Sequence, residues 1–190
     1  MVRRVHIRQT EVLCYDPGEL YRMPKDNGTI RFRIAVADAI RTGEKPLPIA
    51  PYLMGYWLGN GSASEPIITV QTCDIAGVLQ RILPRHEVTG IYRNHGDSLR
   101  FCVPDLKPVL LKSFHDKVIP MEYLRASYYQ RLDLLQGLMD SDGSISDRKG
   151  QAIYTSTEKA LVESVSELLW SLGIKNAITT AESTQRADWS

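Results

Sequence analysis

Two apolar segments in the middle of the chain share a pattern that is typical of closely packed helices. Residues 53–61 read LMGYWLGNG, and residues 135–143 read LQGLMDSDG. Each segment has small residues four positions apart, namely Gly55 and Gly59 in the first and Gly137 and Ser141 in the second. Four positions apart is one face of a helix, and small side chains there let two helices approach closer than the usual spacing of about 8–10 Å. The pattern therefore predicts two helices that pack against each other along these faces.

Each segment ends in a polar residue followed by glycine, which gives the pairs Asn60-Gly61 and Asp142-Gly143. Glycine readily adopts the left-handed conformation that closes many helices, so we expect such turns here. Two helices that pack side by side would deliver Asn60 and Asp142 to one point. Helix C-termini carry free carbonyl groups and partial negative charge, and an added carboxylate makes an oxygen-rich site suited to Mg²⁺. A plain helix cap is the alternative interpretation of Asp142-Gly143.

The periodicity around these segments predicts a mixed α and β chain with an internal duplication. The first copy has an expected helix over 51–59, a strand over 67–71, a helix carrying Val78, Leu79, Ile82 and Leu83 that Pro84 ends, strands over 88–93 and 98–103, and a helix over 106–114. The second has an expected helix from a Ser127/Gln130 capping box to Ser141, a hairpin within 143–155, a helix capped by Thr157, with Gly173 just past its end, and a strand over 174–180.

Domain boundaries follow from the breaks in this pattern. Lys45-Pro46-Leu47-Pro48 interrupts any regular element, so residues 1–45 form an expected N-terminal extension. A strand over 29–34 in it would place Arg31 and Arg33 on one face, and a short helix is expected over 36–40. The first repeat is expected over 46–126 and the second over 127–190. The polar end of the chain, 181–190, is a poor candidate for further elements, which indicates a truncated second repeat.

Composition excludes several classes of protein. The formal net charge is +1, so overall charge gives no argument for nucleic acid. The three cysteines, Cys14, Cys73 and Cys102, lack CxxC spacing, which argues against a disulfide framework or a zinc site and favours buried free thiols. We expect neither a secretory signal nor a membrane span, and we expect the protein in the cytoplasm, associated with the nucleoid when bound to DNA.

Together, the paired segments resemble the LAGLIDADG homing endonucleases. The flanking residues 48–52, 117–120 and 123–124 are similar to the intein-borne branch of that family, and the resemblance covers about residues 46–180. It implies an α+β fold in which two pseudo-symmetric αββαββα repeats within one chain form a saddle-shaped sheet surface over double-stranded DNA. It also implies hydrolysis of phosphodiester bonds with Mg²⁺ or another divalent cation. Because the second repeat looks incomplete, a complementary C-terminal fragment is a further expected partner.

The resemblance assigns roles to particular residues. Asp142 matches a metal-binding catalytic acid, Asn60 stands in the place of the other acid, and Lys117 matches a basic residue that the family often keeps near the cut. The expected metal ligands are Asp142, Asn60, Gly59 and Ser141. An amide cannot give a metal a full negative charge, so we expect cleavage to be slow, one-stranded or absent. For Lys117, a solvated surface lysine is an equal alternative.

Polar positions on the expected strands are candidates for contact with DNA, because Arg and Gln suit base edges and Lys suits phosphates. They are Ser62, Ser64, Thr69, Gln71, Arg93, Arg100, Ser144, Ser146, Arg148, Lys149, Gln151 and Tyr154. An ordinary solvated sheet face is the alternative for each of them. His86, His95 and His115 show no ligand spacing, which favours surface or capping roles.

Two functions remain in competition at this point. The first is a site-specific DNA endonuclease that Asn60 weakens or disables, and the second is a module of the same fold that binds DNA without cutting it. Protein splicing by this chain alone is disfavoured, because the chain begins Met1-Val2 and ends Asp188-Trp189-Ser190 rather than with a nucleophile and His-Asn.

Overall fold

The computed structural model describes residues 2–6, 9–13, 16–22, 25–26, 29–30, 37–93, 96–110, 117–146 and 150–180. The chain forms two compact units, Met1–Ala37 and Asp38–Ser190. In the first unit, β1 (Val2–His6) pairs antiparallel with β2 (Gln9–Leu13), helix α1 (Pro17–Arg22) follows, and β3 (Lys25–Asp26) pairs antiparallel with β4 (Thr29–Ile30). The strand expected over 29–34 thus begins as β4, while Arg31 and Arg33 lie outside the described residues.

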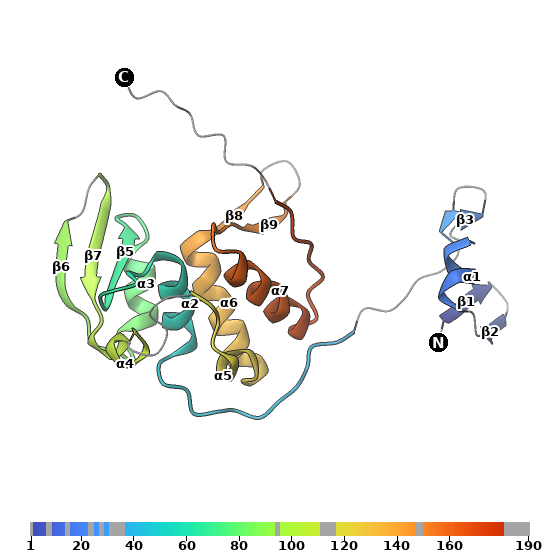
Figure 1. The fold of residues 1–190 in the computed structure, drawn as a ribbon, viewed down its shortest axis with the longest axis horizontal. Helices are drawn as coiled ribbons and strands as arrows, with labels where there is room; N and C mark the ends of the chain where they lie inside the picture. Colours follow the sequence, from blue (N-terminus) through green and yellow to red (C-terminus); the bar gives the residue numbers. More distant parts are fainter. Residues whose placement is uncertain are drawn as a thin grey trace, which may run out of the picture. The chain divides into compact units, whose positions relative to one another are not determined.

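The second unit contains the residues of both expected copies (Figure 1). The first copy comprises α2 (Pro51–Asn60), β5 (Ile67–Gln71), α3 (Ile75–Ile82), β6 (Thr89–Arg93), β7 (Ser98–Cys102), the 3₁₀ turn η1 (Pro104–Leu106) and α4 (Lys107–Leu110). Helix α5 (Met121–Leu124) leads into the second copy, which comprises α6 (Tyr128–Asp142), β8 (Gly143–Ile145), β9 (Ala152–Tyr154) and α7 (Lys159–Ser171). No helix in these described stretches is long and apolar enough to cross a membrane.

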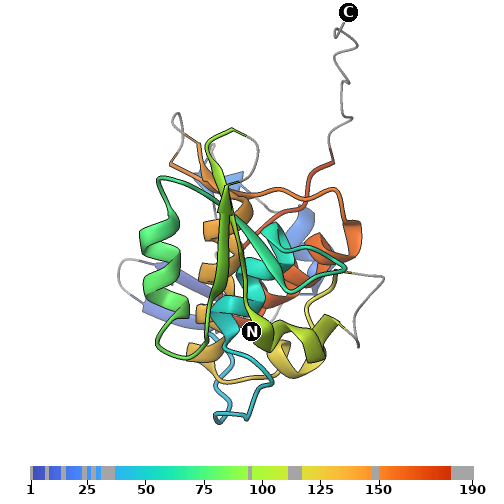
Figure 2. The same cartoon turned by 90° about the vertical axis from the view of Figure 1, so that its left-hand side faces the viewer.

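Two antiparallel sheets accompany the helices. The first copy has a three-stranded sheet in the order β5–β7–β6, and the second has the hairpin β8–β9. Viewed from the side of the larger sheet, its strands lie in front of α2 and α6 (Figure 2). The α+β class is therefore confirmed, as is the hairpin expected within 143–155. Helices and sheets share one core, whose most deeply buried side chains are Ile68, Phe101, Val103, Leu106, Leu134, Leu138 and Leu168.

Helix α2 lies at the centre of this core. Its residues from Pro51 to Leu58 are all buried, which explains why its sequence is apolar on every side. Helix α6 begins with the expected capping box, in which the Ser127 hydroxyl accepts from the Gln130 N–H and the Gln130 side chain accepts from the Ser127 N–H. This cap fixes where α6 begins.

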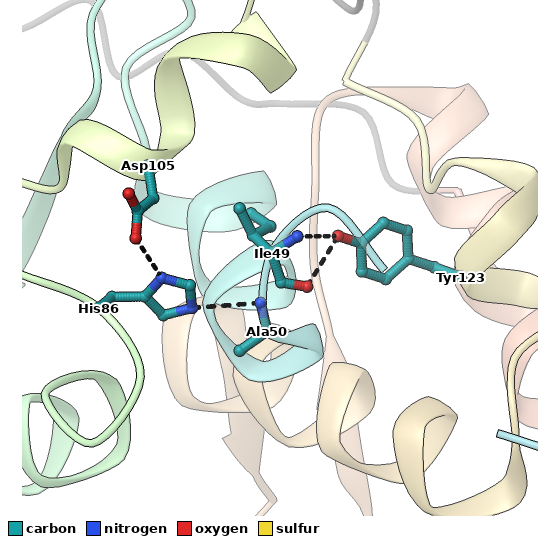
Figure 3. A network of polar contacts seen from close by, with 5 residues as sticks. All are labelled: Ile49, Ala50, His86, Asp105 and Tyr123. Carbon is teal, nitrogen blue, oxygen red and sulfur yellow. Dashed lines mark hydrogen bonds and ion pairs between the residues drawn. The ribbon is translucent and has the colours of Figure 1, made fainter. Parts of the chain in front are cut away.

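Side chains from α5 and from the segments before β6 and after β7 hold the start of α2 (Figure 3). The Ala50 N–H donates to His86 Nε2 at 3.2 Å, and His86 Nδ1 lies 2.8 Å from an Asp105 carboxylate oxygen. Because Nε2 accepts, the proton is on Nδ1 and is donated to Asp105. Tyr123 binds the other side, where its hydroxyl accepts from the Ile49 N–H and donates to the Ile49 carbonyl. The capping role expected for His86 is confirmed, whereas His95 and His115 lie outside the described residues.

A buried arginine joins three separate segments of the second unit. Arg131 on α6 is only 1% exposed. Its guanidinium donates to the carbonyl oxygens of Ala126 and Ser171 at 3.0 and 2.7 Å and also to that of Ile40. Ala126 lies in the turn before α6, Ser171 ends α7, and Ile40 lies in the segment that leads into the first copy. One side chain, that of Arg131, therefore holds these three segments together.

Several sequence expectations are wrong in detail. Residues 37–40 form no helix, and α7 begins after Glu158 rather than Thr157, without a side-chain cap. The stretch 174–180 is not a strand, because the hairpin beside it recruits no third strand and its Ile174 and Ile178 are exposed. The helix expected over 106–114 is a 3₁₀ turn followed by α4 as far as the structure describes it, and Leu83 is exposed rather than buried with Ile82.

The cysteine expectation is corrected as well. Cys73 is exposed and Cys102 is partly buried, and both are free thiols, while Cys14 lies outside the described residues.

Candidate functional site

The small residues of α2 and α6 face each other, and the two backbones touch. A Cβ on Gly55 would collide with the Leu134 carbonyl oxygen and lie 2.9 Å from the Leu138 nitrogen. A Cβ on Gly137 would collide in the same way with the Tyr52 carbonyl oxygen and lie 2.8 Å from the Tyr56 nitrogen. The close approach expected from the glycine spacing is confirmed, and it forces the C-terminal ends of both helices to the same place.

At these ends the two motifs converge. A Cβ on Gly59 would lie 2.6 Å from the Ser141 Cβ and 2.8 Å from Asp142 Oδ2, so the last turns of the helices are in contact. The Asn60 side chain crosses between them, because its Nδ2 donates to the Ser141 carbonyl oxygen at 3.2 Å. The structure therefore brings Asn60, Gly59, Ser141 and Asp142 together from segments about 80 residues apart in sequence.

The glycines that follow are required for a different reason from the expected one. Gly61 and Gly143 have φ values of −86° and −85°, which is extended backbone rather than the left-handed conformation. A Cβ on Gly61 would collide with the Trp57 ring and lie 2.5 Å from the Trp57 carbonyl oxygen. A Cβ on Gly143 would meet Met139 at its carbonyl and its methyl group. Lack of space beside the last helical turn, not backbone conformation, excludes larger residues here.

Lys117 caps the end of α2. Its Nζ donates to the carbonyl oxygens of Gly61 at 2.7 Å, Gly59 at 3.1 Å and Trp57 at 3.4 Å. Burial lowers the pKa of the Lys117 ammonium, and the negative charge of Asp142 opposes that shift. Lys117 is therefore not the solvated surface lysine of the alternative interpretation, since its charge is held against the free carbonyls of a helix end beside the candidate acid.

Asp142 is a partly buried carboxylate with a cationic neighbour, Lys117. Burial raises the pKa of Asp142, and Lys117 opposes this shift. Asp140, two residues earlier, belongs to a different contact, because it accepts a hydrogen bond from the Tyr52 hydroxyl at 2.8 Å. Asp142 is thus the carboxylate that the helix pair presents at its C-terminal end.

The donor set fits one divalent cation rather than two. Mg²⁺ in proteins is commonly held by one or two carboxylates together with water and substrate phosphates. Asp142 can supply one such carboxylate. In the half-site of Asn60, however, the Gly59 carbonyl accepts from the Lys117 ammonium and the Ser141 carbonyl accepts from the Asn60 amide. Among the residues that the structure describes, no three His, Cys, Asp or Glu side chains gather as a metal-binding group.

Two tyrosines of α2 support this site and were missed by sequence reasoning. Tyr52, Tyr56 and Asn60 follow one another at four-residue intervals, so they share a helix face, and this spacing was the available signal. The Asn60 side chain hydrogen-bonds the Tyr56 hydroxyl, and burial, the larger effect, raises the pKa of Tyr56 to about 12. The hydrogen bond to Tyr56 and the one to Ser141 together fix the orientation of the Asn60 amide.

The larger sheet divides the DNA-contact candidates between two faces. Thr69 on β5 lies opposite Arg100 on β7, and Arg100 lies opposite Tyr92 on β6, so these three share a face. Gln71 also lies on this outward face of β5, whose other face buries Ile68 and Val70. Arg93 is exposed, but its register partner is Leu99, which places it on the opposite face. Tyr92, which is 57% exposed, is a contact candidate that the sequence analysis missed.

The remaining candidates lie after the end of α2 or along the β8–β9 hairpin. Ser62 and Ser64 follow α2 and hydrogen-bond each other, while Ser146 and Gln151 pair next to the hairpin turn. Ser144 and Tyr154 lie on opposite faces of the hairpin, because their register partners are Ile153 and Gly143. Arg148 and Lys149 lie outside the described residues.

Comparison with known proteins found similarities to a family model, a curated relative and a solved structure. Residues 130–189 match the family model described as LAGLIDADG-like domain. A curated relative, "Replicative DNA helicase DnaB" from Mycobacterium intracellulare, is 29% identical over 159 residues, which are 84% of this chain and 25% of the relative. The chain thus spans about a quarter of the length of that relative. A solved structure described as "Structures and dynamics of mesophilic variants from the homing endonuclease I-DmoI" is similar with a TM-score of 0.48 and 16% identity, over 73% of this chain and 84% of that chain.

The segment matched by the family model includes the residues of α6 that pack against α2. The matched segment contains Gly137, Ser141 and Asp142, and the structure packs that part of α6 against the corresponding part of α2. This part of the chain is thus similar to the LAGLIDADG-like domain.

Proposed function

We propose that this protein is a site-specific DNA endonuclease in which one of two catalytic positions is disabled. The observation that carries the proposal is the junction of α2 and α6, where Asn60 and Asp142 meet at the ends of two helices whose backbones touch. A carboxylate in that place can hold a divalent cation against a phosphate. The DNA is double-stranded, because both repeats contribute a sheet beside one junction.

Asp142, Lys117 and Asn60 have different roles at this junction. A divalent cation bound by Asp142 would supply Lewis-acid stabilisation of the phosphate and a nucleophilic water. Lys117, held by the α2 carbonyls, adds a positive charge that attracts the phosphate and opposes the cost of burying Asp142. Burial of both groups strengthens their interaction compared with that of exposed charges. Asn60 supplies no charge and occupies the Ser141 carbonyl.

Because Asp142 is a carboxylate and Asn60 an uncharged amide, the substitution Asn60→Asp should restore the missing charge. A target site is first selected from a random library of double-stranded DNA, and cleavage of that site with Mg²⁺ is then measured for both chains. Asn60→Asp is expected to raise the rate of cleavage by about 100-fold, equivalent to roughly 3 kcal/mol of transition-state stabilisation, because a carboxylate binds the cation that the amide does not. The original chain is expected to nick one strand slowly or to leave both intact.

Gln136→Glu is the matched control, since it adds the same charge to an exposed position of α6 away from the junction. Its cleavage rate should equal that of the original chain. If Asn60→Asp binds the selected site and still cuts neither strand, the endonuclease proposal fails.

A second candidate function is DNA recognition without cleavage. It is favoured by the contacts of Asn60, which satisfy the amide within the protein and need no cation. The same cleavage assay separates the two functions, because a recognition module binds its site with unchanged affinity when Mg²⁺ is removed and does not gain activity with Asn60→Asp.

We also propose that the chain is borne by an intein. The relative named as a replicative DNA helicase matches over only 25% of its length, as expected if the matched part is an insertion rather than part of the helicase machinery. The DNA on both sides of this coding sequence should then encode the two halves of one host protein. Continuous non-coding DNA on both sides would contradict the proposal.

A further inference from the structure

A tyrosine hydroxyl close to Asp142 is buried without a partner. Tyr154 on β9 is the sole residue in the described ranges with a buried side-chain nitrogen or oxygen atom that makes no hydrogen bond. A buried hydroxyl without a partner loses its hydrogen bonds to water and destabilises the fold, so such groups commonly bind an ordered water or serve a functional site. Tyr154 therefore needs an explanation that core packing does not give.

The position of Tyr154 points to Asp142. Tyr154 is the register partner of Gly143, the residue that follows Asp142. The next residue of β9 continues the contact, because the Thr155 N–H donates to the Asp142 carbonyl oxygen at 3.4 Å. A tyrosine phenol carries its proton at neutral pH, so Tyr154 is a hydrogen-bond donor.

The first copy provides an internal comparison. There, Ile68 bridges to Gly61 as Tyr154 pairs with Gly143. Ile68 is 0% exposed and apolar, and the helix end beside it carries the Asn60 amide. The phenol thus occurs in the copy that has kept a carboxylate, and an apolar side chain takes the corresponding position in the copy that has not.

We propose that Tyr154 is a positioning residue for Asp142, whose hydroxyl donates to a water molecule that the Asp142 carboxylate also binds. The shared water fixes the carboxylate at the helix junction, where Asp142 would hold a cation. The role toward a cation rests on the proposed endonuclease function, whereas the water-mediated link between Tyr154 and Asp142 does not. We accordingly assign Tyr154 the role of positioning Asp142 rather than that of contacting DNA.

Thermal melting without metal or DNA tests the contact itself. Tyr154→Phe should lower the melting temperature by about 2–4 °C, the effect of one hydrogen bond in a domain of this size. The loss should vanish when the same change is made in an Asp142→Ala background, because the water then has no second partner. Tyr92→Phe, at an exposed position of β6, is the control and should not change the melting temperature.

An unchanged or higher melting temperature for Tyr154→Phe would show that the hydroxyl has no partner and would overturn the proposal. So would an equal loss in the Asp142→Ala background.

Calorimetric titration with Mn²⁺ tests the positioning role. Tyr154→Phe should weaken Mn²⁺ binding about tenfold, as loss of an outer-shell contact commonly does, and Tyr92→Phe should not. Binding by Tyr154→Phe as tight as that of the original chain overturns the positioning role. If Asp142→Ala itself binds Mn²⁺ like the original chain, the proposed endonuclease site fails, and the melting experiment alone decides whether Tyr154 contacts Asp142.

Discussion

Asn60 and Asp142 occupy corresponding helix ends, yet they are stabilised in different ways. The Asn60 amide hydrogen-bonds the Ser141 carbonyl and the Tyr56 hydroxyl, so its contacts are satisfied within the protein. Asp142 is a partly buried charge whose cationic neighbour, Lys117, is shared with the carbonyls of α2. The retained carboxylate is thus costly for folding, which is typical of a functional residue rather than a structural one.

This cost predicts that Asp142→Asn stabilises the protein near neutral pH. The folded-state pKa of Asp142 is raised, so folding disfavours the ionised carboxylate wherever it is charged. Asn removes that penalty, and we expect a rise in melting temperature of about 2 °C at pH 7.

The gain should shrink as the pH falls through the raised pKa and be absent below about 4, the ordinary pKa of aspartate, where the carboxyl is protonated in both states. Melting curves between pH 3 and pH 7 measure it. Asp97→Asn, at an exposed position, is the control. A lower melting temperature for Asp142→Asn at pH 7 would contradict the assigned cost.

At the scale of elements, the pairing of α2 with α6 rests on glycines that cannot be replaced. Gly137→Ala places a methyl group against the Tyr52 carbonyl and 2.8 Å from the Tyr56 nitrogen, so the helices must separate. We expect a loss of about 1–3 kcal/mol in the free energy of unfolding, measured by urea denaturation.

Gly77→Ala on α3 is the matched control. A Cβ there meets no atom within 4 Å, so this change should stabilise the protein by about 0.5–1 kcal/mol through the higher helix propensity of alanine. Equal effects of the two changes would argue against backbone contact between α2 and α6.

The elements that sequence reasoning predicted well are those specified by local pattern. The glycine spacing and the capping box at Ser127 predicted α2, α6 and their contact, because helix faces and caps depend on residues within one or two turns. The strand expected over 174–180 failed, because a strand requires a partner that sequence alone does not show. The need for glycine at position 61 likewise comes from the space that the Trp57 ring occupies, which the sequence pattern did not show.

The site was predictable to a similar extent. Asn60 and Asp142 were found because their motifs repeat, and Lys117 was found by resemblance alone. The hydrogen bonds of Lys117 to Gly59 and Gly61, at residues more than 50 positions away, could not be predicted, because they depend on the path of the chain between them.

At the scale of the whole molecule, Arg131 holds together segments that no single element connects. Its buried guanidinium donates to the Ala126, Ser171 and Ile40 carbonyls. Arg131→Met keeps most of the volume but leaves these carbonyls without their donor, so we expect a loss of about 3 kcal/mol in the free energy of unfolding.

Arg131→Lys should recover only part of that loss, since one ammonium cannot reach three carbonyls with the geometry of a guanidinium. Arg125→Met, which removes an exposed arginine paired with Glu167, is the control and should cost less than about 1 kcal/mol. Equal stability of Arg131→Met and the original chain would show that the three carbonyls need no donor.

The contact of helix backbones through Gly55 and Gly137 has an evolutionary consequence. Because main-chain atoms define the junction, replacing an acid at its tip leaves the frame intact, and the codons for asparagine and aspartate differ in a single base. Under the proposed function, a lineage can therefore lose cutting activity without losing the scaffold and recover it by one point mutation. Selection that relaxes on the acid still acts on the glycines, so inactive descendants should keep the helix pair long after the chemistry is gone.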